Sequence, residues 1–381
     1  MAGERAMLML DDGACFSGEA CGAPGEAAGE VVFTTAMAGY QETLTDPSYY
    51  GQIVVFTAAH IGNYGATPLD EESGSVRAAG AVFHDLCDQR ASGADPRFPH
   101  WRAAESLDQS LGRAGVAAVS GLDTRALTLH LREHGARNGI ISSLDTDKAS
   151  LLRRAQALPP MQGQDLAGRV TCDRPYVFSP PNGRVVPAPA SPPLRVAVID
   201  YGVKRSILVH LIRRGMLPHV WPASADARDI LASRPDGVLL SNGPGDPEPC
   251  RHAVKTVRAL LGRVPLFGIC LGHQLLGLAL GGKTYKLPFG HHGVNHPVKD
   301  LLTGRVLVTS QNHGFCVDPH SLPDHVTPSH WNLNDDTLEG LACARVPAFS
   351  VQFHPEAAPG PADAVGLFGR FRAMMESGEG R

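Results

Sequence analysis

Residues 268–274 read Gly-Ile-Cys-Leu-Gly-His-Gln, and this stretch is the most informative of the chain. An apolar run at 264–269 predicts a strand before the cysteine, and leucines at helical spacing from 271 to 280 predict a helix after it. A cysteine at such a turn, with a glycine two positions away on each side, is typical of a nucleophile elbow. The glycines permit a very tight turn, and the free N–H groups of the following helix favour thiolate over thiol. Cys270 is therefore the candidate nucleophile; the alternative is a buried structural cysteine.

A second motif, His354-Pro355-Glu356, supplies the candidate base. Residues 349–353 alternate apolar and polar side chains, which predicts a strand that Pro355 ends. Because side chains two apart in an extended segment point the same way, Glu356 can reach one nitrogen of the His354 ring. A base held by a carboxylate is what a cysteine nucleophile requires. Together with the elbow, this motif favours catalysis over an ordinary surface histidine.

The third motif lies at residues 239–247, Leu-Leu-Ser-Asn-Gly-Pro-Gly-Asp-Pro. The apolar strand expected at 237–240 enters a loop in which two glycines expose backbone N–H groups. Such groups form oxyanion holes, which stabilise the charge that develops in a tetrahedral intermediate. Taken alone, this motif is better interpreted as an ordinary Gly-Pro turn.

Strands and helices alternate through the C-terminal half of the chain. Strands are expected at 195–200, 219–221 and 237–240, and helices at 204–214, 227–232 and around 254–261. This alternation predicts an α/β domain, a doubly wound and mostly parallel sheet with helices on both faces. The three motifs then fall at the carboxyl ends of strands, where the sites of such folds gather.

A Walker A pattern at residues 277–284 matches letter by letter but has the wrong context. A phosphate-binding loop follows a strand and opens a helix. Here Gly277 falls inside the helix after Cys270, and Gly281-Gly282 should end that helix before a new strand. We therefore interpret the pattern as a helix C-terminus.

The order and spacing of the three motifs resemble those of the class I (triad) glutamine amidotransferases, over roughly residues 195–381. The resemblance implies a flavodoxin-like domain in which Cys270 attacks the side-chain amide of glutamine. His354 would be the base and proton shuttle, with Glu356 behind it, and the products would be glutamate and ammonia. The backbone of Gly243 and Leu271 would supply the oxyanion donors.

Length and composition limit the number of domains and the classes of partner for the whole chain. A length of 381 residues predicts two or three domains, and the net charge of −4 gives no sign of nucleic-acid or anionic-membrane binding. No apolar run approaches the length of a membrane span. The eight cysteines show no C-x-x-C pair, which favours reduced thiols in a cytoplasm.

Seven prolines between 175 and 193 predict an extended connector. We therefore divide the chain into an N-terminal domain at 1–150, a connector at 151–194 and the amidotransferase-like domain at 195–381. In the first domain we expect a hairpin at 8–16, strands at 31–33 and 53–56, a loop at 40–49 and a helix from about 120 to 133. No nucleophile–base pair stands out there, so a scaffold or docking role is favoured.

Motifs of both halves resemble the small-chain family of the carbamoyl-phosphate synthetases, across essentially the whole chain. They are G-E-V-V-F-T-T-A-M-A-G-Y-Q-E (29–42), L-T-D-P-S-Y (44–49), H-I-G-N-Y-G (60–65), G-L-D-T-R-A-L-T (121–128), F-G-H-H-G-V-N-H-P-V-K (289–299) and Q-N-H-G-F (311–315). The resemblance implies a separate N-terminal β/α domain. It also implies a set of glutamine-binding residues: Ser48, Gly243, Gly245, Leu271, Gln274, Asn312, Gly314 and Phe315. One departure is Val294, where the family usually repeats glycine.

The resemblance further implies a large-chain partner. Ammonia would pass to that chain, which uses ATP, Mg and bicarbonate to make carbamoyl phosphate for arginine and pyrimidine synthesis; this chain itself would need no cofactor or metal. His291, His292 and His296 are then better interpreted as part of a structural or substrate-side loop than as metal ligands. Three alternatives stay open: the amidotransferase of another synthetase, a stand-alone thiol hydrolase, and a docking subunit with a decayed triad.

Overall fold

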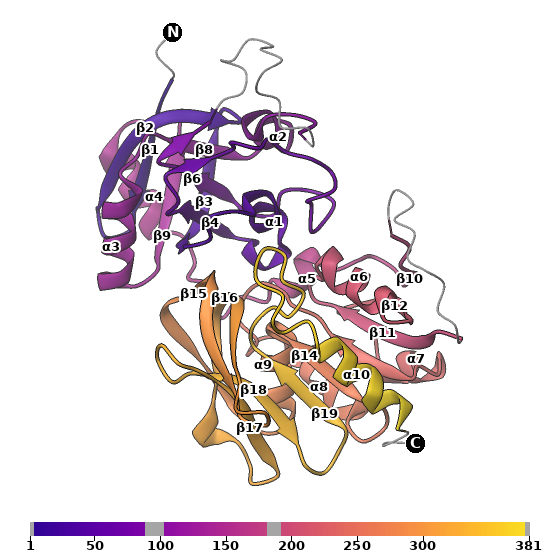
Figure 1. Cartoon of the computed structure of the whole chain (residues 1–381). Helices are drawn as coiled ribbons and strands as arrows, with labels where there is room; N and C mark the ends of the chain where they lie inside the picture. Colours follow the sequence, from indigo (N-terminus) through magenta and orange to yellow (C-terminus); the bar gives the residue numbers. More distant parts are fainter. Residues whose placement is uncertain (1–3, 88–102, 181–191, 378–381) are drawn as a thin grey trace. The chain divides into compact units, whose positions relative to one another are not determined.

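The computed structural model describes residues 4–87, 103–180 and 192–377 (Figure 1). The chain forms two compact units, Met1–Met161 with Pro288–His292, and Gln162–Leu287 with Gly293–Arg381. The segment expected to be a connector, 151–194, is thus divided between the two units. Residues 181–191 of the proline-rich stretch lie outside the described part of the chain.

The first unit is a closed barrel with the strand order β1-β2-β8-β6-β4-β3-β9. The barrel closes because β1 pairs with both β2 and β9. Aliphatic side chains such as Leu8, Val31 and Ile53 fill its core. The expectation of an N-terminal β/α domain is therefore confirmed only in part: helices accompany the strands, but long-range antiparallel pairings, such as that of β3 with β9, close the sheet into a barrel. The strands are β1 (Arg5–Leu10), β2 (Cys15–Gly22), β3 (Glu26–Thr34), β4 (Gln52–Phe56), β6 (Gly80–Val82), β8 (Ala117–Ser120) and β9 (Arg137–Ser142), and the helices are α2 (Leu107–Arg113), α3 (Thr124–His134) and α4 (Lys148–Gln156).

Local patterns in this unit give the expected elements with one exception. The hairpin of β1 and β2, the strands β3 and β4 and the helix α3 are confirmed. The stretch expected to be a loop forms the short helix α1 (Tyr40–Thr45) and the 3-10 turn η1 (Pro47–Tyr49). The Tyr40 hydroxyl donates to the carbonyl of Gly65 at 2.6 Å, and Asp46 Oδ1 accepts from the N–H of Ser48 at 2.9 Å. These contacts order a segment whose composition suggests a loop. Two short strands, β5 (His60–Ile61) and β7 (Asp85–Leu86), form a separate parallel pair.

The second unit contains a ten-stranded sheet in the order β10-β12-β11-β13-β14-β19-β18-β17-β15-β16. Five strands, from β12 to β19 in that order, pair in parallel. The strands that follow from β18 to β15, and β10 at the other edge, pair antiparallel. The sheet is therefore mixed rather than mostly parallel. The strands are β10 (Tyr176–Val177), β11 (Leu194–Asp200), β12 (Met216–Pro222), β13 (Gly237–Leu240), β14 (Leu266–Ile269), β15 (Lys283–Asp300), β16 (Val306–Asp318), β17 (Val326–Asn332), β18 (Leu338–Cys343) and β19 (Ala348–Val351).

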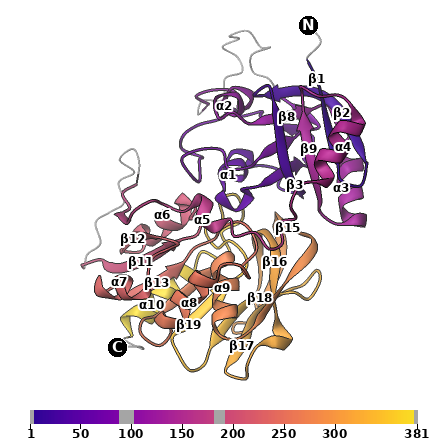
Figure 2. The same ribbon diagram turned by 180° about the vertical axis from the view of Figure 1, so that it is seen from behind.

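Helices cover both faces of the parallel part of this sheet, as Figures 1 and 2 show from opposite sides. One core cluster holds buried side chains of α7 (Ala227–Ala232), α8 (Arg251–Leu260) and α9 (Leu271–Ala279). A second cluster, on the other face, holds those of α6 (Arg205–Arg213) and α10 (Leu367–Glu376). The doubly wound arrangement of the parallel strands is thereby confirmed. Short helical turns α5 (Ala167–Val170) and η3 (Pro319–Ser321) complete the unit.

The Walker-like stretch ends a helix, as expected. Helix α9 ends at Ala279, Gly281 has a φ of 101°, and β15 begins at Lys283. Two segments expected to be loops are instead parts of long strands. Residues 289–297 lie inside β15, and residues 311–315 lie inside β16. Their histidines, asparagines and glycines are weak strand formers, and pairing with neighbouring strands overrides that preference. Among the described residues, no helix combines the length and apolar character needed to span a membrane.

Candidate active site

Cys270 stands at a strained turn between β14 and α9. Its backbone has φ 54° and ψ −107°, a region that costs a non-glycine residue about 1–3 kcal/mol and that clusters at functional sites. The positions two residues before and after Cys270 have no room for a side chain, so both must be glycine. A Cβ on Gly268 would lie 2.6 Å from the carbonyl oxygen of Gly272, and one on Gly272 would lie 2.2 Å from that of Leu240. The elbow predicted from the sequence is confirmed.

His354 and Glu356 form a buried pair after β19. His354 Nδ1 and Glu356 Oε1 are 2.7 Å apart, and both side chains are at most 1% exposed. The strand itself ends at Val351, earlier than Pro355 predicts, and the N–H of His354 donates instead to the carbonyl of Ser310 in β16 at 2.9 Å. His354 is thus held from both sides, by a carboxylate at one ring nitrogen and by a neighbouring strand at its backbone.

The electrostatics of this pair favour the charged forms. Burial by itself lowers the pKa of His354, but the Glu356 carboxylate and the Cys270 sulfur outweigh it and raise this pKa from 6.5 to about 10. His354 Nε2 makes no hydrogen bond of ordinary geometry to any described residue. One ring nitrogen is therefore engaged by the carboxylate, and the other remains for the sulfur or a reacting group.

Lys204 is a member of the site that the sequence analysis missed. Its Nζ donates to Glu356 Oε1 at 2.8 Å and to the carbonyl of Ala358, and its side chain is 2% exposed. Burial by itself raises the pKa of Glu356, whereas the positive charges of Lys204 and His354 hold it well below its usual range. One signal was available: Lys204 directly precedes α6, and a cation at a helix N-terminus is unfavourable unless something else holds it.

The glycine-rich loop after β13 lies against the elbow. The Ser241 carbonyl accepts the N–H of Gly272 at 3.0 Å, and a Cβ on Gly243 would lie 2.1 Å from the carbonyl oxygen of Tyr201. Within the described residues, the backbone N–H groups of Gly243 and Leu271 have no acceptor. Both groups are available for an oxyanion, and that role stays a prediction.

Of the predicted glutamine-binding residues, several lie around Cys270 in the second unit. The Cys270 Sγ lies 3.5 Å from the carbonyl oxygen of Asn312. The Gln274 amide donates to the carbonyl of Phe315 at 2.7 Å and to Gln352 Oε1 at 3.1 Å, which ties α9 to β16.

The other predicted binding residues occupy different elements. Gly245 follows Gly243 in the loop with a φ of 90°, and Gly314 lies in β16. Ser48 belongs to the first unit, buried in η1. The contacts of all these residues with glutamine stay predictions.

A second buried histidine beside the elbow, His273, has a structural environment. Its Nδ1 lies 2.9 Å from the hydroxyl of Ser350, and burial lowers its pKa to about 3. A neutral ring bonded to a neighbouring strand cannot be the protonated partner of a thiolate. His354 is therefore the only one of these two histidines suited to acid–base chemistry.

The chain matches two family models, one for each half. Residues 197–374 match the glutamine amidotransferase class-I model, and residues 8–141 match the CPSase domain of the carbamoyl-phosphate synthase small chain. Relatives align over nearly the full length. The carbamoyl phosphate synthase small chain of Thioalkalivibrio sulfidiphilus is 50% identical over 97% of both chains, and that of Syntrophotalea carbinolica is 49% identical over 98% of both.

The chain belongs to the family of carbamoyl phosphate synthase small chains. The small chain of Thermosynechococcus vestitus, 50% identical over 98% of this chain and 97% of its own length, supports the same assignment. The class-I glutamine amidotransferase domain makes this chain the glutaminase component of a carbamoyl phosphate synthase. The family predicted from the motifs is confirmed.

Proposed function

We propose that this chain hydrolyses L-glutamine to glutamate and ammonia, with Cys270 as nucleophile, His354 as base and proton carrier, and Glu356 as the carboxylate that orients His354. One observation carries the proposal: a strained, buried cysteine lies beside an imidazole whose far nitrogen is 2.7 Å from a buried carboxylate. The raised pKa of His354 favours the imidazolium at neutral pH, which makes this ring a suitable proton donor to a leaving group.

In the first half of the reaction the Cys270 thiolate attacks the side-chain amide carbon of glutamine. Negative charge moves onto the amide oxygen, where the N–H groups of Gly243 and Leu271 are the proposed donors. The His354 imidazolium then gives its proton to the leaving nitrogen. Ammonia departs as the C–N bond breaks, and a γ-glutamyl thioester remains on Cys270.

In the second half water attacks the thioester and His354, now neutral, takes a proton from it. The C–S bond breaks, glutamate leaves, and the thiolate–imidazolium pair returns. Lys204 and Glu356 act through His354: the carboxylate stabilises the imidazolium, and the lysine keeps the carboxylate charged.

For recognition of glutamine we propose Ser48, Gly243, Gly245, Leu271, Gln274, Asn312, Gly314 and Phe315. The bond of Gln274 to the Phe315 carbonyl supports this set, because it fixes α9 against β16 beside the nucleophile. The short distance from Cys270 to the Asn312 carbonyl supports it too. Ser48 enters the proposal through the family resemblance of its motif.

We further propose that ammonia passes to a large chain, which uses ATP, Mg and bicarbonate to form carbamoyl phosphate for arginine and pyrimidine synthesis. The small-chain family supports such a partner. In this scheme the present chain needs no cofactor for glutamine hydrolysis and makes no carbamoyl phosphate alone. All eight cysteines are free thiols, which suits a reducing cytoplasm.

Glutamate release by the purified chain tests the proposal, alone and with the large chain, with and without ATP and bicarbonate. We expect slow hydrolysis by the chain alone and acceleration by the partner with both substrates. Fast hydrolysis indifferent to partner, ATP and bicarbonate would favour a stand-alone thiol hydrolase or another synthetase. No glutamate under any condition would favour a docking subunit without activity.

A further inference from the structure

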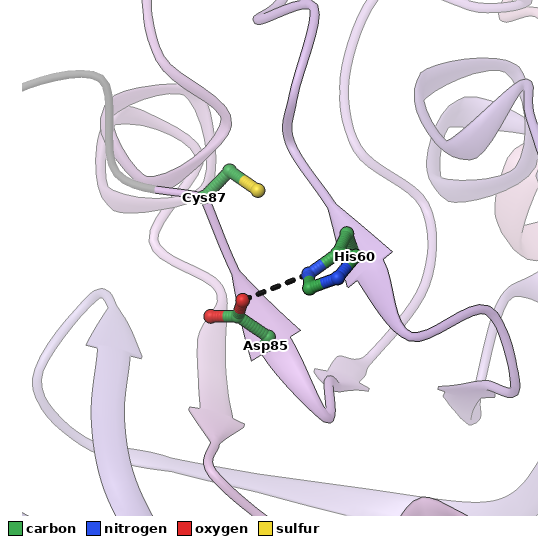
Figure 3. Close-up of side chains that lie close together, drawn as sticks. All are labelled: His60, Asp85 and Cys87. Carbon is green, nitrogen blue, oxygen red and sulfur yellow. Dashed lines mark hydrogen bonds and ion pairs between the residues drawn. The ribbon is translucent and has the colours of Figure 1, made fainter.

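A second group of cysteine, histidine and carboxylate lies in the first unit, at the short parallel pair of β5 and β7. His60 is opposite Asp85 in the pairing register, and His60 Nδ1 is 2.9 Å from Asp85 Oδ2. Cys87 follows Asp85 by two positions. One ligand atom from each of the three residues can be chosen so that all lie within 4.8 Å of one another. Figure 3 shows the Asp85 carboxylate bonded to the His60 ring and the Cys87 sulfur directed toward the same ring.

We propose that His60, Asp85 and Cys87 bind a divalent cation of the zinc class. Imidazole and thiolate are the ligands that Zn²⁺ prefers, and a carboxylate completes a three-residue set that leaves one position for water. Magnesium and calcium take oxygen ligands and fit this set poorly. The site does not depend on the proposed glutaminase function. It goes beyond the sequence analysis, which predicts no metal in this chain.

The distances suit a tetrahedral ion after small side-chain rotations. With bonds of about 2.0–2.3 Å, zinc separates its ligand atoms by roughly 3.3–3.8 Å. His60 Nδ1 and Asp85 Oδ2 are 2.9 Å apart, and one ligand atom from each of the three residues lies within 4.8 Å of the others, so shifts of about an ångström would place them at tetrahedral separations. The His60 and Asp85 side chains are 68% and 55% exposed, so a hydrated ion can reach them from solvent.

The backbone that carries the three ligands is fixed. The N–H of Cys87 donates to the Ile61 carbonyl at 2.8 Å, and the N–H of Leu86 donates to the Ser120 hydroxyl at 3.1 Å, which ties β7 to the end of β8 in the barrel. Ile61 and Phe83, beside the ligands in sequence, are buried. The ligand positions are thus held before a metal arrives, which favours binding.

The thiol distinguishes this group from an ordinary surface ion pair. An exposed histidine–aspartate contact contributes little by itself. His130 and Asp12 form a histidine–aspartate contact at 2.7 Å with side chains 25% and 22% exposed, and in the described part of the chain no cysteine joins them in a comparable group. That pair is a matched control.

As the metal binds, the Cys87 Sγ–H bond breaks, the proton goes to solvent, and sulfur donates its electron pair to the ion in place of a bound water.

Cobalt provides the test, because Co²⁺ bound to a thiolate has a sulfur-to-metal charge-transfer band in the ultraviolet. The full chain is stripped with a chelator, kept reduced, and titrated with Co²⁺. Zn²⁺ affinity is then measured by competition with a chromophoric chelator. We expect one Co²⁺ per chain with the charge-transfer band, displaced by Zn²⁺. His60→Ala, Asp85→Asn and Cys87→Ser should each weaken Zn²⁺ binding at least about tenfold, since even outer partners of a metal contribute ~10–100-fold.

Matched variants separate this site from other thiols and ion pairs. His130→Ala and Cys343→Ser should keep the band and the affinity of the unaltered chain. Hydrogen exchange of the Cys87 amide should slow when Zn²⁺ binds, because its bond to Ile61 lies within the site. Absence of stoichiometric Co²⁺ binding, or an unchanged band and affinity in both Cys87→Ser and Cys87→Ala, would overturn the proposal.

Discussion

The two units each contain one group of cysteine, histidine and carboxylate, and the two groups differ in almost everything except their residue types. Cys270, His354 and Glu356 are buried, whereas the His60 and Asp85 side chains beside Cys87 are more than half exposed. Cys270 has a left-handed backbone conformation at a strand-to-helix turn, whereas Cys87 directly follows the short strand β7. Burial and backbone geometry, more than residue type, therefore support the proposed catalytic role of one group and the proposed metal site at the other.

The two groups also differ in the charges that surround them. In the second unit, Lys204 is a fourth, buried member that keeps Glu356 ionised, and Glu356 in turn favours a protonated His354. At the exposed group, water screens the His60–Asp85 contact. If the comparison is right, equivalent substitutions in the two groups have very different effects.

The largest contrast concerns the two cysteines. Cys270→Ser should lower glutamine hydrolysis by about 10⁴- to 10⁶-fold, because the thiolate makes the covalent intermediate. Ammonia-dependent carbamoyl phosphate synthesis by the complex should survive. Cys87→Ser should leave glutamine hydrolysis within about twofold, since surface changes away from a site have small effects. Steady-state glutamate release measures the activity of both variants. Equal losses of activity would show that the two cysteines do not differ in role.

The carboxylates give the next contrast. Glu356→Gln should lower kcat by about 10³- to 10⁴-fold, because an amide neither fixes the useful tautomer of His354 nor stabilises its cation. Asp85→Asn should leave kcat unchanged. Measurement of kcat and KM for both variants checks this. A Glu356→Gln enzyme with nearly normal kcat would show that His354 works without its carboxylate.

The buried Lys204–Glu356 pair and an exposed ion pair should differ in their contribution to the free energy of unfolding. Lys204→Met should lower the free energy of unfolding by about 3–5 kcal/mol, because it leaves a buried carboxylate with one partner fewer. Arg113→Met breaks the exposed Arg113–Glu105 pair and should cost at most about 1 kcal/mol. Urea unfolding of both variants is the measurement. Similar small losses would mean that the Lys204–Glu356 pair is not the buried contact described above.

These contrasts also bear on what a sequence can predict. The elbow, His354-Pro355-Glu356 and the end of α9 follow from local patterns, because glycine spacing, proline and apolar periodicity act within a few residues. The closed barrel cannot be predicted from local patterns, because β3 pairs with β9, which lies more than 100 residues away in the sequence. The strand segments at 289–297 and 311–315 are strands only because neighbouring strands pair with them, and Lys204 is buried only because Glu356 and Ala358 fold onto it.

The last contrast is a pH dependence of stability. The pKa of His354 is raised in the folded protein from 6.5 to about 10, so its contribution is fully present below pH 6.5 and is lost as the pH rises through 10. The unaltered chain should therefore lose more stability between pH 6.5 and 10 than His354→Gln does. Urea unfolding at several pH values measures the difference. A parallel pH profile in the two proteins would contradict a stabilised imidazolium.

In the proposed mechanism Cys270 carries the acyl group of glutamine. Rapid acid quenching of the enzyme with labelled glutamine, followed by peptide mass spectrometry, tests it most directly. We expect a γ-glutamyl thioester on the peptide that contains Cys270, retained in Cys87→Ser and absent from Cys270→Ser. Label on another residue, or glutamate formation by Cys270→Ser at the normal rate, would contradict it.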